Sequence, residues 1–445
     1  MAAALHVTVA LLLFLAGRLA LVSSFDTNGI LVPSDSTTYR VEAAFLAETF
    51  ARSGIAGWMA APSPLHVKLY SLSFVIFGPV CGFTILGAEP LNLVYYLSTL
   101  TLIFLLGREV FDRTTGLIAA AIVALWPSPL VFSTQLYRDP LFVALLLAIV
   151  LITVRWLTQV YEWPQALMTG AAGGALATVM WVVRKDVWEI VLIILCVGLL
   201  LLLVRQFREK RVLGGNLLGA LLLLTIMAGI PRFVAPFQQA KFVPVAATWG
   251  PPDGAVALNP TRNGTTSWSH LLHRIKGKRR AWQIYSTSGS NIDSWVQFNS
   301  VGDIILYLPR AVAIGFFAPF PNMWLEAGTG VGRAGRLLSG AETCLMYTVQ
   351  LLALFCLWRE RRQLSVWLLA VTICLGVTAL GIVVCNVGAL YRLRYIYWML
   401  LIIVGAGGAL RLPGVRPFLM RVGRATNPLR EGVASDCQGE RRVSS

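Results

Sequence analysis

The sequence predicts an all-α polytopic membrane protein, and three observations support that fold class. The 445 residues are 57% hydrophobic and only 13% charged, with a mean hydropathy of +0.70, which is unlike the composition of a soluble globular domain. Apolar runs of about 20 residues recur along the chain, each long enough to cross about 30 Å of hydrocarbon. Basic residues gather in short connections between these runs, as the positive-inside rule expects of membrane helices.

We expect a bundle of about ten transmembrane helices, with a count from about eight to thirteen left open. The predicted spans are Leu5–Val22, Leu91–Gly107, Thr115–Phe132, Leu141–Leu157, Ala166–Val183, Val187–Val204, Val212–Ile230, Leu337–Leu357, Leu364–Cys385 and Ile396–Ala409. Two further apolar stretches, Leu69–Leu86 and Ile304–Leu325, are interrupted by Gly and Pro. We interpret them as interfacial or re-entrant helices in the outer loops, since protein must bury any irregular backbone at membrane depth.

The net charge of +16 indicates membrane orientation rather than a nucleic-acid partner. Cations concentrate at Arg205–Arg211, at Trp358–Arg362 and in the C-terminal tail, which places these segments in the cytoplasm. No segment resembles an RNA- or DNA-binding module, so we predict no nucleic-acid partner. The seven cysteines lie mostly inside predicted spans, so neither a disulfide framework nor a zinc motif is indicated.

Counting spans outward from the basic loops divides the chain into four regions. They are an N-terminal transmembrane module at 1–231 with its first outer loop at 23–90, an extracytoplasmic loop at 232–335 with a re-entrant segment at 304–325, C-terminal transmembrane helices at 336–411 and a basic cytoplasmic tail at 412–445. The basic segment His273–Trp282 lies in the second outer region. It is interpreted either as a solvated surface or as an element that contacts a phosphate or an acidic glycan.

Two isolated carboxylates each stand at the start of a predicted helix. Asp35, in PSDS, precedes a helical pattern that runs to about Arg52. Asp139, in YRDP, precedes a predicted span, and Pro140 suits the first turn of a helix. Ser34, Asp35 or Ser36 could simply cap the first helix, and Asp139 could cap the second while Arg138 pairs with it locally. The functional alternative is a general base or a metal ligand for Asp35, and for Asp139 a carboxylate that orients Arg138 or completes a metal site.

Several isolated cations are predicted at the same membrane face as the two carboxylates. Lys68 lies in PSPLHVKLY, and Arg392 and Arg394 lie in LYRLRYIYW. Each of these cations could simply anchor the chain at the interface. Two arginines at i and i+2 need not share a helical face, so one of them could reach a common site without the other. Ionisable groups that converge at a bilayer boundary are nevertheless candidates for function.

The order of these elements resembles the GT-C superfamily of polyprenyl-phosphate-dependent glycosyltransferases. The likeness is closest to family 39-like protein mannosyltransferases and the lipid A aminoarabinose transferase type. It is carried by Asp35 with Tyr39 downstream, the PSPLHVKLYSL segment at Pro62–Leu72, Asp139 in its RDP, and a late RxRY at Arg392–Tyr395. It is good over roughly residues 1–160 and thin beyond them. The chain departs from the mannosyltransferase pattern at Ser36, where a second acid is expected.

The resemblance implies a GT-C-like bundle that transfers a sugar from a polyprenyl-phosphate carrier. Asp35 would deprotonate an acceptor hydroxyl on a glycan, a lipid or a protein, and direct displacement would invert the anomeric carbon. Asp139 would assist it, and the substrate would be bound by Tyr39, Lys68, Arg138, Arg392 and Arg394. No cofactor is assigned, and a divalent metal is left open.

The implied setting is the lipid bilayer of a bacterial inner or cell membrane, with the active site on the extracytoplasmic side and the C-terminus in the cytoplasm. Two other functions are compatible with the sequence. An envelope polysaccharide polymerase or ligase would also bind lipid-linked donors with outer-face arginines. A lipid-linked saccharide transporter or flippase would instead place polar groups within broken spans.

Overall fold

The computed structural model describes residues 1–22, 24–32, 34–233, 267–284, 291–325 and 332–415. Within these ranges the regular elements are helices, and the β-structure consists of two isolated bridges, Phe25 with Leu31 and Asn291 with Asn386. The predicted all-α class is therefore confirmed for the described residues. Residues 234–266 of the second outer region and 416–445 of the tail lie outside them.

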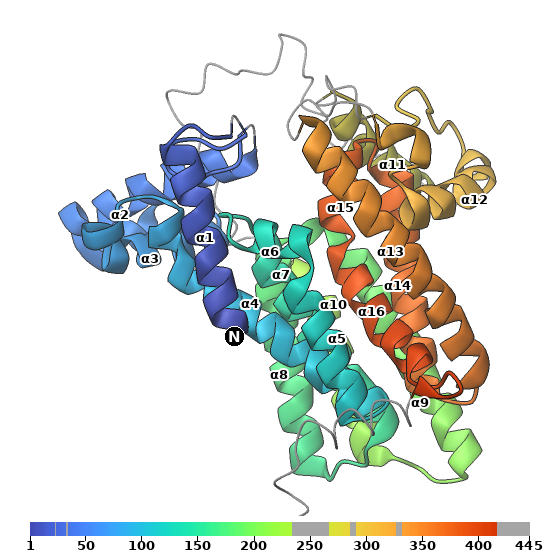
Figure 1. Cartoon of the computed structure of the whole chain (residues 1–445). Coiled ribbons are helices and arrows are strands. Elements are labelled where there is room, and N and C mark those ends of the chain that lie inside the picture. The colour runs from blue at the N-terminus through green and yellow to red at the C-terminus, as the bar shows by residue number, and fades with distance from the viewer. Residues whose placement is uncertain (23, 33, 234–266, 285–290, 326–331, 416–445) are drawn as a thin grey trace, which may run out of the picture.

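Among the described residues, seven helices are long and apolar enough to cross a membrane, as the composition predicts. They form most of the upright bundle in Figure 1. These helices are α4 (Ile85–Val110), α7 (Asp139–Thr158), α8 (Trp163–Val183), α9 (Trp188–Glu209), α10 (Gly214–Phe233), α13 (Gly332–Arg359) and α14 (Leu364–Val383).

Two bent helix pairs raise the number of candidate spans in the described chain to as many as nine. The first pair is α5 (Arg113–Leu125) and α6 (Pro127–Ser133), bent by 69°, and the second is α15 (Val387–Leu393) and α16 (Tyr395–Ala409), bent by 54°. The first bend has a local cause, because the residue before a proline is disfavoured in the α conformation and Trp126 is extended. The described residues thus hold seven to nine candidate spans, and the predicted count of about ten is not confirmed.

The first predicted span, Leu5–Val22, begins and ends earlier in the structure. Helix α1 (Ala2–Arg18) has 17 residues, about 26 Å at the α-helical rise, and its N-terminal end lies about half-way up the bundle in Figure 1. The backbone leaves the helix at Leu19, and Ala20 has a φ of 51°. Apolar composition alone therefore placed both ends of this helix three to four residues too late in the chain.

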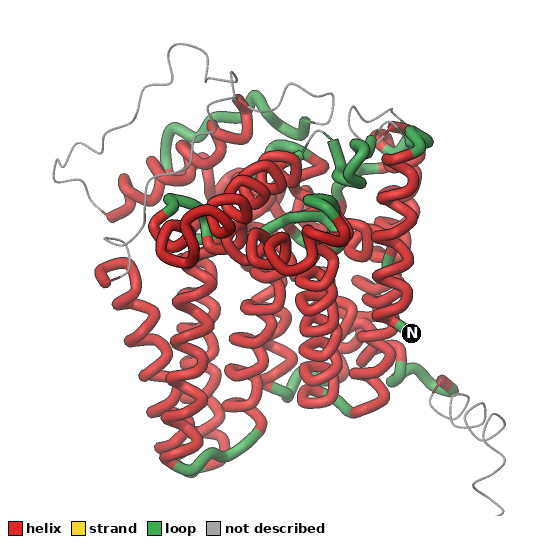
Figure 2. Tube along the Cα trace, turned by 90° about the vertical axis from the view of Figure 1, so that its left-hand side faces the viewer, coloured by secondary structure: helices red, strands yellow, loops and turns green. Residues whose placement is uncertain are grey.

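Helices α2 (Asp35–Ala60) and α3 (Leu65–Cys81) form a separate flank of the molecule. They cross the direction of the long helices (Figures 1 and 2) and share a small core that includes Leu46, Phe74 and Leu136. Gly54 has a φ of 63° inside α2, so the predicted stop near Arg52 is a kink. The expected interfacial segment Leu69–Leu86 is instead divided between α3 and the start of α4.

The other flank at the same end is formed by α11 (Ser267–Ile284), α12 (Val301–Phe317) and the short 3-10 turn η3 (Pro321–Met323). Arg279 holds α11 in place through the carbonyls of Val296, Asp293 and Ile382, at 3.1, 2.7 and 2.5 Å. Part of the predicted basic segment is therefore a docked helix. The re-entrant character predicted for 304–325 stays a prediction.

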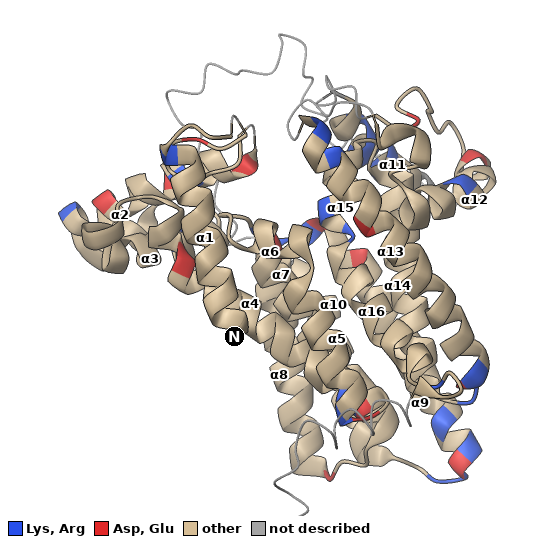
Figure 3. Ribbon diagram, in the orientation of Figure 1, with Lys and Arg blue, Asp and Glu red and all other residues tan. Residues whose placement is uncertain are grey.

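Charged residues lie mostly at the two ends of the long helices, with an uncharged middle (Figure 3). This distribution is expected where the middle lies in hydrocarbon. The C-terminal end of α9, which precedes Lys210 and Arg211, lies far from its N-terminal end at Trp188, because 22 residues of helix extend about 33 Å. Arg184 stands just before Trp188, separated from it only by the turn η1 (Lys185–Val187), and so marks the opposite end from the basic loops.

Close helix packing yields one test of the fold. A methyl group at Gly381 of α14 would come within 2.0 Å of the Ala311 carbonyl oxygen of α12, whereas a methyl group at Gly277 of α11 would meet nothing within 4 Å. We expect Gly381→Ala to destabilise the protein by about 1–3 kcal/mol through overpacking. Gly277→Ala should leave the stability unchanged or slightly raised. Thermal unfolding midpoints in detergent measure both, and an equal response of the two variants would contradict the α12–α14 contact.

Candidate functional site

A cluster of charged side chains forms where three distant segments meet at one end of the bundle. The Arg392 guanidinium of α15 lies 3.2 Å from the Asp35 carboxylate, through Nη2, and 3.1 Å from the Asp139 carboxylate, through Nε. Asp35 begins α2 and Asp139 begins α7. One arginine therefore joins the two predicted carboxylates.

The local structure leaves both carboxylates free of a capping role. The N-cap of α2 is Ser34, whose hydroxyl accepts a hydrogen bond from Ser36 N at 3.3 Å. Helix α7 has no side-chain cap, and Arg138 occupies its N-cap position. Both acids still gain from the positive end of a helix dipole. Of the three candidate caps of α2, Ser34 is therefore the cap, and the alternative that Asp139 caps α7 is wrong. The oxygens of Asp35 and Asp139 contact cations instead.

Arg184 is a member of this cluster that the sequence motifs do not indicate. It lies at the C-cap of α8 and forms an ion pair with Asp139, the two side chains being 9% and 14% exposed. Its guanidinium also lies 5.3 Å from the centre of the Phe142 ring. The buried ion pair joins α7 to α8, and sequence spacing alone does not predict such a contact between two helices.

Two tyrosines border the cluster. The Arg392 guanidinium lies 4.4 Å from the centre of the Tyr137 ring, a cation–π distance. Tyr39 is half-buried in α2, and its burial raises the pKa of its phenol against the opposing charge of Arg138. Tyr39 therefore stays a neutral hydroxyl at physiological pH. Tyr39 and Arg138 both belong to this neighbourhood, as the sequence predicts.

Lys68 is engaged elsewhere. Its Nζ donates to the Met59 carbonyl oxygen at 2.8 Å and lies 5.4 Å from the centre of the Trp58 ring. These contacts tie α3 to the end of α2, and Lys68 forms no ion pair with Asp35 or Asp139. Lys68 is therefore not a member of the charged cluster around Arg392.

Arg394 lies apart from the charged cluster, although the resemblance implies that it binds the substrate together with Arg392. It is fully buried, donates from Nη1 to the Gly315 carbonyl oxygen at 3.1 Å, and lies 4.0 Å from the centre of the Trp398 ring. Nearby, the buried Glu342 accepts from Ser128 N at 2.9 Å and from the Tyr391 hydroxyl. Arg394 therefore locks the α15–α16 bend against α12, and Glu342 links α13 to α6 and α15.

The residues of the cluster do not fit a divalent metal. Hard cations such as Mg²⁺ prefer several oxygen ligands, but the cluster offers two carboxylates, each already in contact with a guanidinium. The described chain holds no group of three or more His, Cys, Asp or Glu side chains arranged to bind a metal. The positive charge between Asp35 and Asp139 comes from Arg392 rather than from a metal ion.

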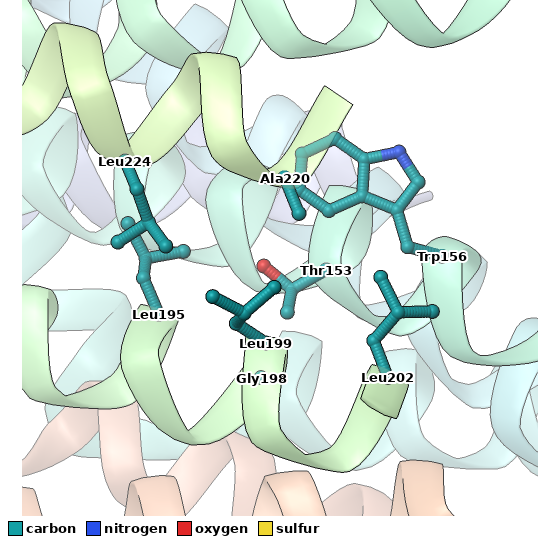
Figure 4. Close-up of a pocket in the computed structure, with 8 residues that line it drawn as sticks. All are labelled: Thr153, Trp156, Leu195, Gly198, Leu199, Leu202, Ala220 and Leu224. Atoms are coloured by element: carbon teal, nitrogen blue, oxygen red, sulfur yellow. The ribbon is translucent and has the colours of Figure 1, made fainter. Parts of the chain in front are cut away.

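A cavity between α7, α9 and α10 lies away from the charged cluster (Figure 4). Leucines dominate its lining, and its one hydroxyl, that of Thr153, already donates to the Ile149 carbonyl oxygen at 2.9 Å. An apolar gap of this kind offers a ligand no polar contact. We interpret it as a packing defect of the bundle rather than a binding site.

No protein-family model matches the chain, and neither a curated protein nor a solved structure matches it. The GT-C resemblance therefore stays a prediction, carried by the motifs alone.

The Asp139–Arg184 ion pair gives a test of the site. Removing one partner of a buried ion pair typically costs about 3–5 kcal/mol, because the remaining charge stays buried. We expect Arg184→Ala to lose stability on that scale, reduced because Arg392 still contacts Asp139. The matched control is Arg52→Ala, which breaks a pair with Glu48 whose side chains are 79% and 50% exposed and should cost less than about 1 kcal/mol. Equal shifts in the unfolding midpoint of both variants would contradict this account.

Proposed function

We propose that the protein is an integral-membrane glycosyltransferase that transfers a sugar from a polyprenyl-phosphate carrier to an acceptor hydroxyl on the extracytoplasmic face. The observation that carries the proposal is the contact of Arg392 with both Asp35 and Asp139. It places a carboxylate that can accept a proton beside a guanidinium that can bind a phosphate. The motif resemblance adds the lipid-linked sugar.

The two carboxylates differ in exposure, and this difference assigns their roles. The Asp35 side chain is 59% exposed, whereas that of Asp139 is 14% exposed and contacts both Arg184 and Arg392. Asp35 is therefore the group that an acceptor can reach, and it acts as the general base. Asp139 is a positioning residue, because it fixes the orientation of the two arginines.

The reaction follows from this division. The acceptor oxygen loses its proton to Asp35 and attacks the anomeric carbon, while the bond from that carbon to the phosphate oxygen breaks. The leaving phosphate retains the bonding electrons, and Arg392 and Arg138 stabilise its negative charge. A single displacement inverts the anomeric configuration. The acceptor is a hydroxyl of a glycan, a lipid or a protein.

A lipid-linked saccharide transporter is the second candidate, and the bent helices favour it. Transporters bind substrates where membrane helices are broken, and the α15–α16 bend carries the buried Arg394 close to Glu342. In Figure 1 both bends lie toward the end that carries α2, α3, α11 and α12 rather than at mid-height. A site at one end supports the enzyme over the transporter.

Replacing Asp35 tests the catalytic proposal. We expect Asp35→Asn to lower turnover by at least about 100-fold, because an amide cannot accept the acceptor proton. The assay incubates purified protein with a panel of polyprenyl-phosphate sugars and acceptors and measures the freed carrier. Glu48→Gln is the matched control, since Glu48 is an exposed acid on the same helix, and it should keep normal turnover. Normal turnover by Asp35→Asn would show that another group is the base.

The predicted orientation needs its own test. The charged cluster lies at the opposite end of the bundle from the C-terminal end of α9, so single cysteines at Arg52 of α2 and Arg208 of α9 should lie on opposite membrane faces. In a cysteine-free background, an impermeant thiol reagent should label position 52 in intact cells and position 208 only after lysis. Labelling of both positions from one side would contradict a bundle that separates them, and the reverse pattern would place the site in the cytoplasm.

A further inference from the structure

His66 is a buried histidine whose hydrogen-bonding groups are unused. It belongs to α3 and is 3% exposed. Neither Nδ1 nor Nε2 has a hydrogen-bond partner. Buried polar groups in native proteins nearly always have a partner, so an unpaired buried imidazole points to one that is supplied by a ligand or a water.

The position of His66 directs it toward the charged cluster. Tyr70, one helical turn later in α3, donates its hydroxyl to the Tyr137 carbonyl oxygen at 3.0 Å, immediately before Arg138. Because residues four apart share one face of a helix, His66 faces the same segment. Its ring also packs edge-on against Tyr39, with ring centres 4.6 Å apart and planes at 84°. His66 therefore lies next to Tyr39, on the side of the charged cluster that is formed by α2 and α3.

The surroundings of His66 keep it uncharged. Burial and the positive charges of Arg138 and Arg184 lower its pKa to about 3, and the opposing charge of Asp139 is too weak to restore it. At physiological pH the ring is a neutral imidazole, which offers one N–H donor and one acceptor nitrogen. The arginines nearby are donors only. The α2–α3 side thus differs chemically from the guanidinium side.

A hydroxyl group is the natural partner for this neutral side. It both donates and accepts hydrogen bonds, as an imidazole does, and it carries no charge for the arginines to repel or attract. We infer that His66 and Tyr39 form a neutral subsite that binds the hydroxyl-bearing, uncharged part of the ligand, while Arg138 and Arg392 bind its anionic part. Because Tyr39 packs against His66, this binding requires the Tyr39 side chain to move.

The identity of the uncharged part rests on the proposed function, which makes it the transferred sugar. His66 is then a substrate-binding residue that distinguishes a sugar-charged carrier from the bare carrier phosphate. The bare carrier contacts only the arginines, so its affinity does not depend on His66.

The test compares three ligands in protein reconstituted into lipid nanodiscs. They are a short polyprenyl phosphate, the same carrier with each hexose of a panel attached, and the octyl glycoside of each hexose. We expect the wild type to bind one sugar-charged carrier about tenfold more tightly than the bare carrier, the scale of one good hydrogen bond. His66→Phe keeps the ring packing against Tyr39 and should bind both carriers equally. His66→Asn, which keeps a donor and an acceptor, should restore part of the preference.

Control and contrary outcomes separate the two proposals. Trp163→Phe, at an exposed position at the start of α8, far from Arg184 at its other end, should behave as the wild type. An unchanged preference in His66→Phe, or a wild type that prefers no sugar, would overturn the subsite while leaving the phosphate site intact. If neither carrier binds but an octyl glycoside does so in a His66-dependent manner, the subsite stands and the polyprenyl-phosphate proposal falls.

Discussion

The arrangement of this protein at its proposed active end depends on the contact of one arginine with two carboxylates. Arg392 lies between Asp35 and Asp139, which belong to helices separated from it by about 250 residues or more of chain. Charges near a bilayer are costly unless they are paired. The pairing therefore constrains α2, α7 and α15 to meet, and it compensates the negative charge of the two acids in the same place.

Buried groups around this contact keep it in position. Arg184 adds a second cation to Asp139 from the end of α8. On the opposite side of the α15–α16 bend, Arg394 is held by the Gly315 carbonyl and the Trp398 ring. The bend orients the two arginines of the RxRY motif differently, so that one faces the site and the other faces the protein interior. The same motif thus supplies both a functional cation and its structural anchor.

One side of the site carries positive charge and the other is neutral, and this difference determines which ligand groups each side can bind. Arg138, Arg184 and Arg392 can only donate hydrogen bonds, and they favour an anion. His66 and Tyr39 are neutral on the α2–α3 side. A ligand that carries both a phosphate and a hydroxyl-rich group would match this division, and a lipid-linked sugar is such a ligand. The half-buried state of the site would also reduce the competition from water for each of these contacts.

The sequence by itself determined the helical class, the approximate positions of most long helices and the membrane face shared by Asp35, Asp139 and Arg392. These properties are local, since they follow from hydropathy over a single span and from the charges of the loops that flank it. Only the tertiary structure decided that Arg392 rather than Arg394 meets the carboxylates, that Arg184 pairs with Asp139, and that Lys68 binds the end of α2. Those outcomes depend on the rotation of each helix about its axis and on contacts between segments far apart in the chain, which no local pattern specifies. The same reason explains where α1 ends and how α15 and α16 are bent, because contacts in the bundle, and not hydropathy, set these positions. The bend between α5 and α6 is the exception, since the proline that follows Trp126 encodes it locally.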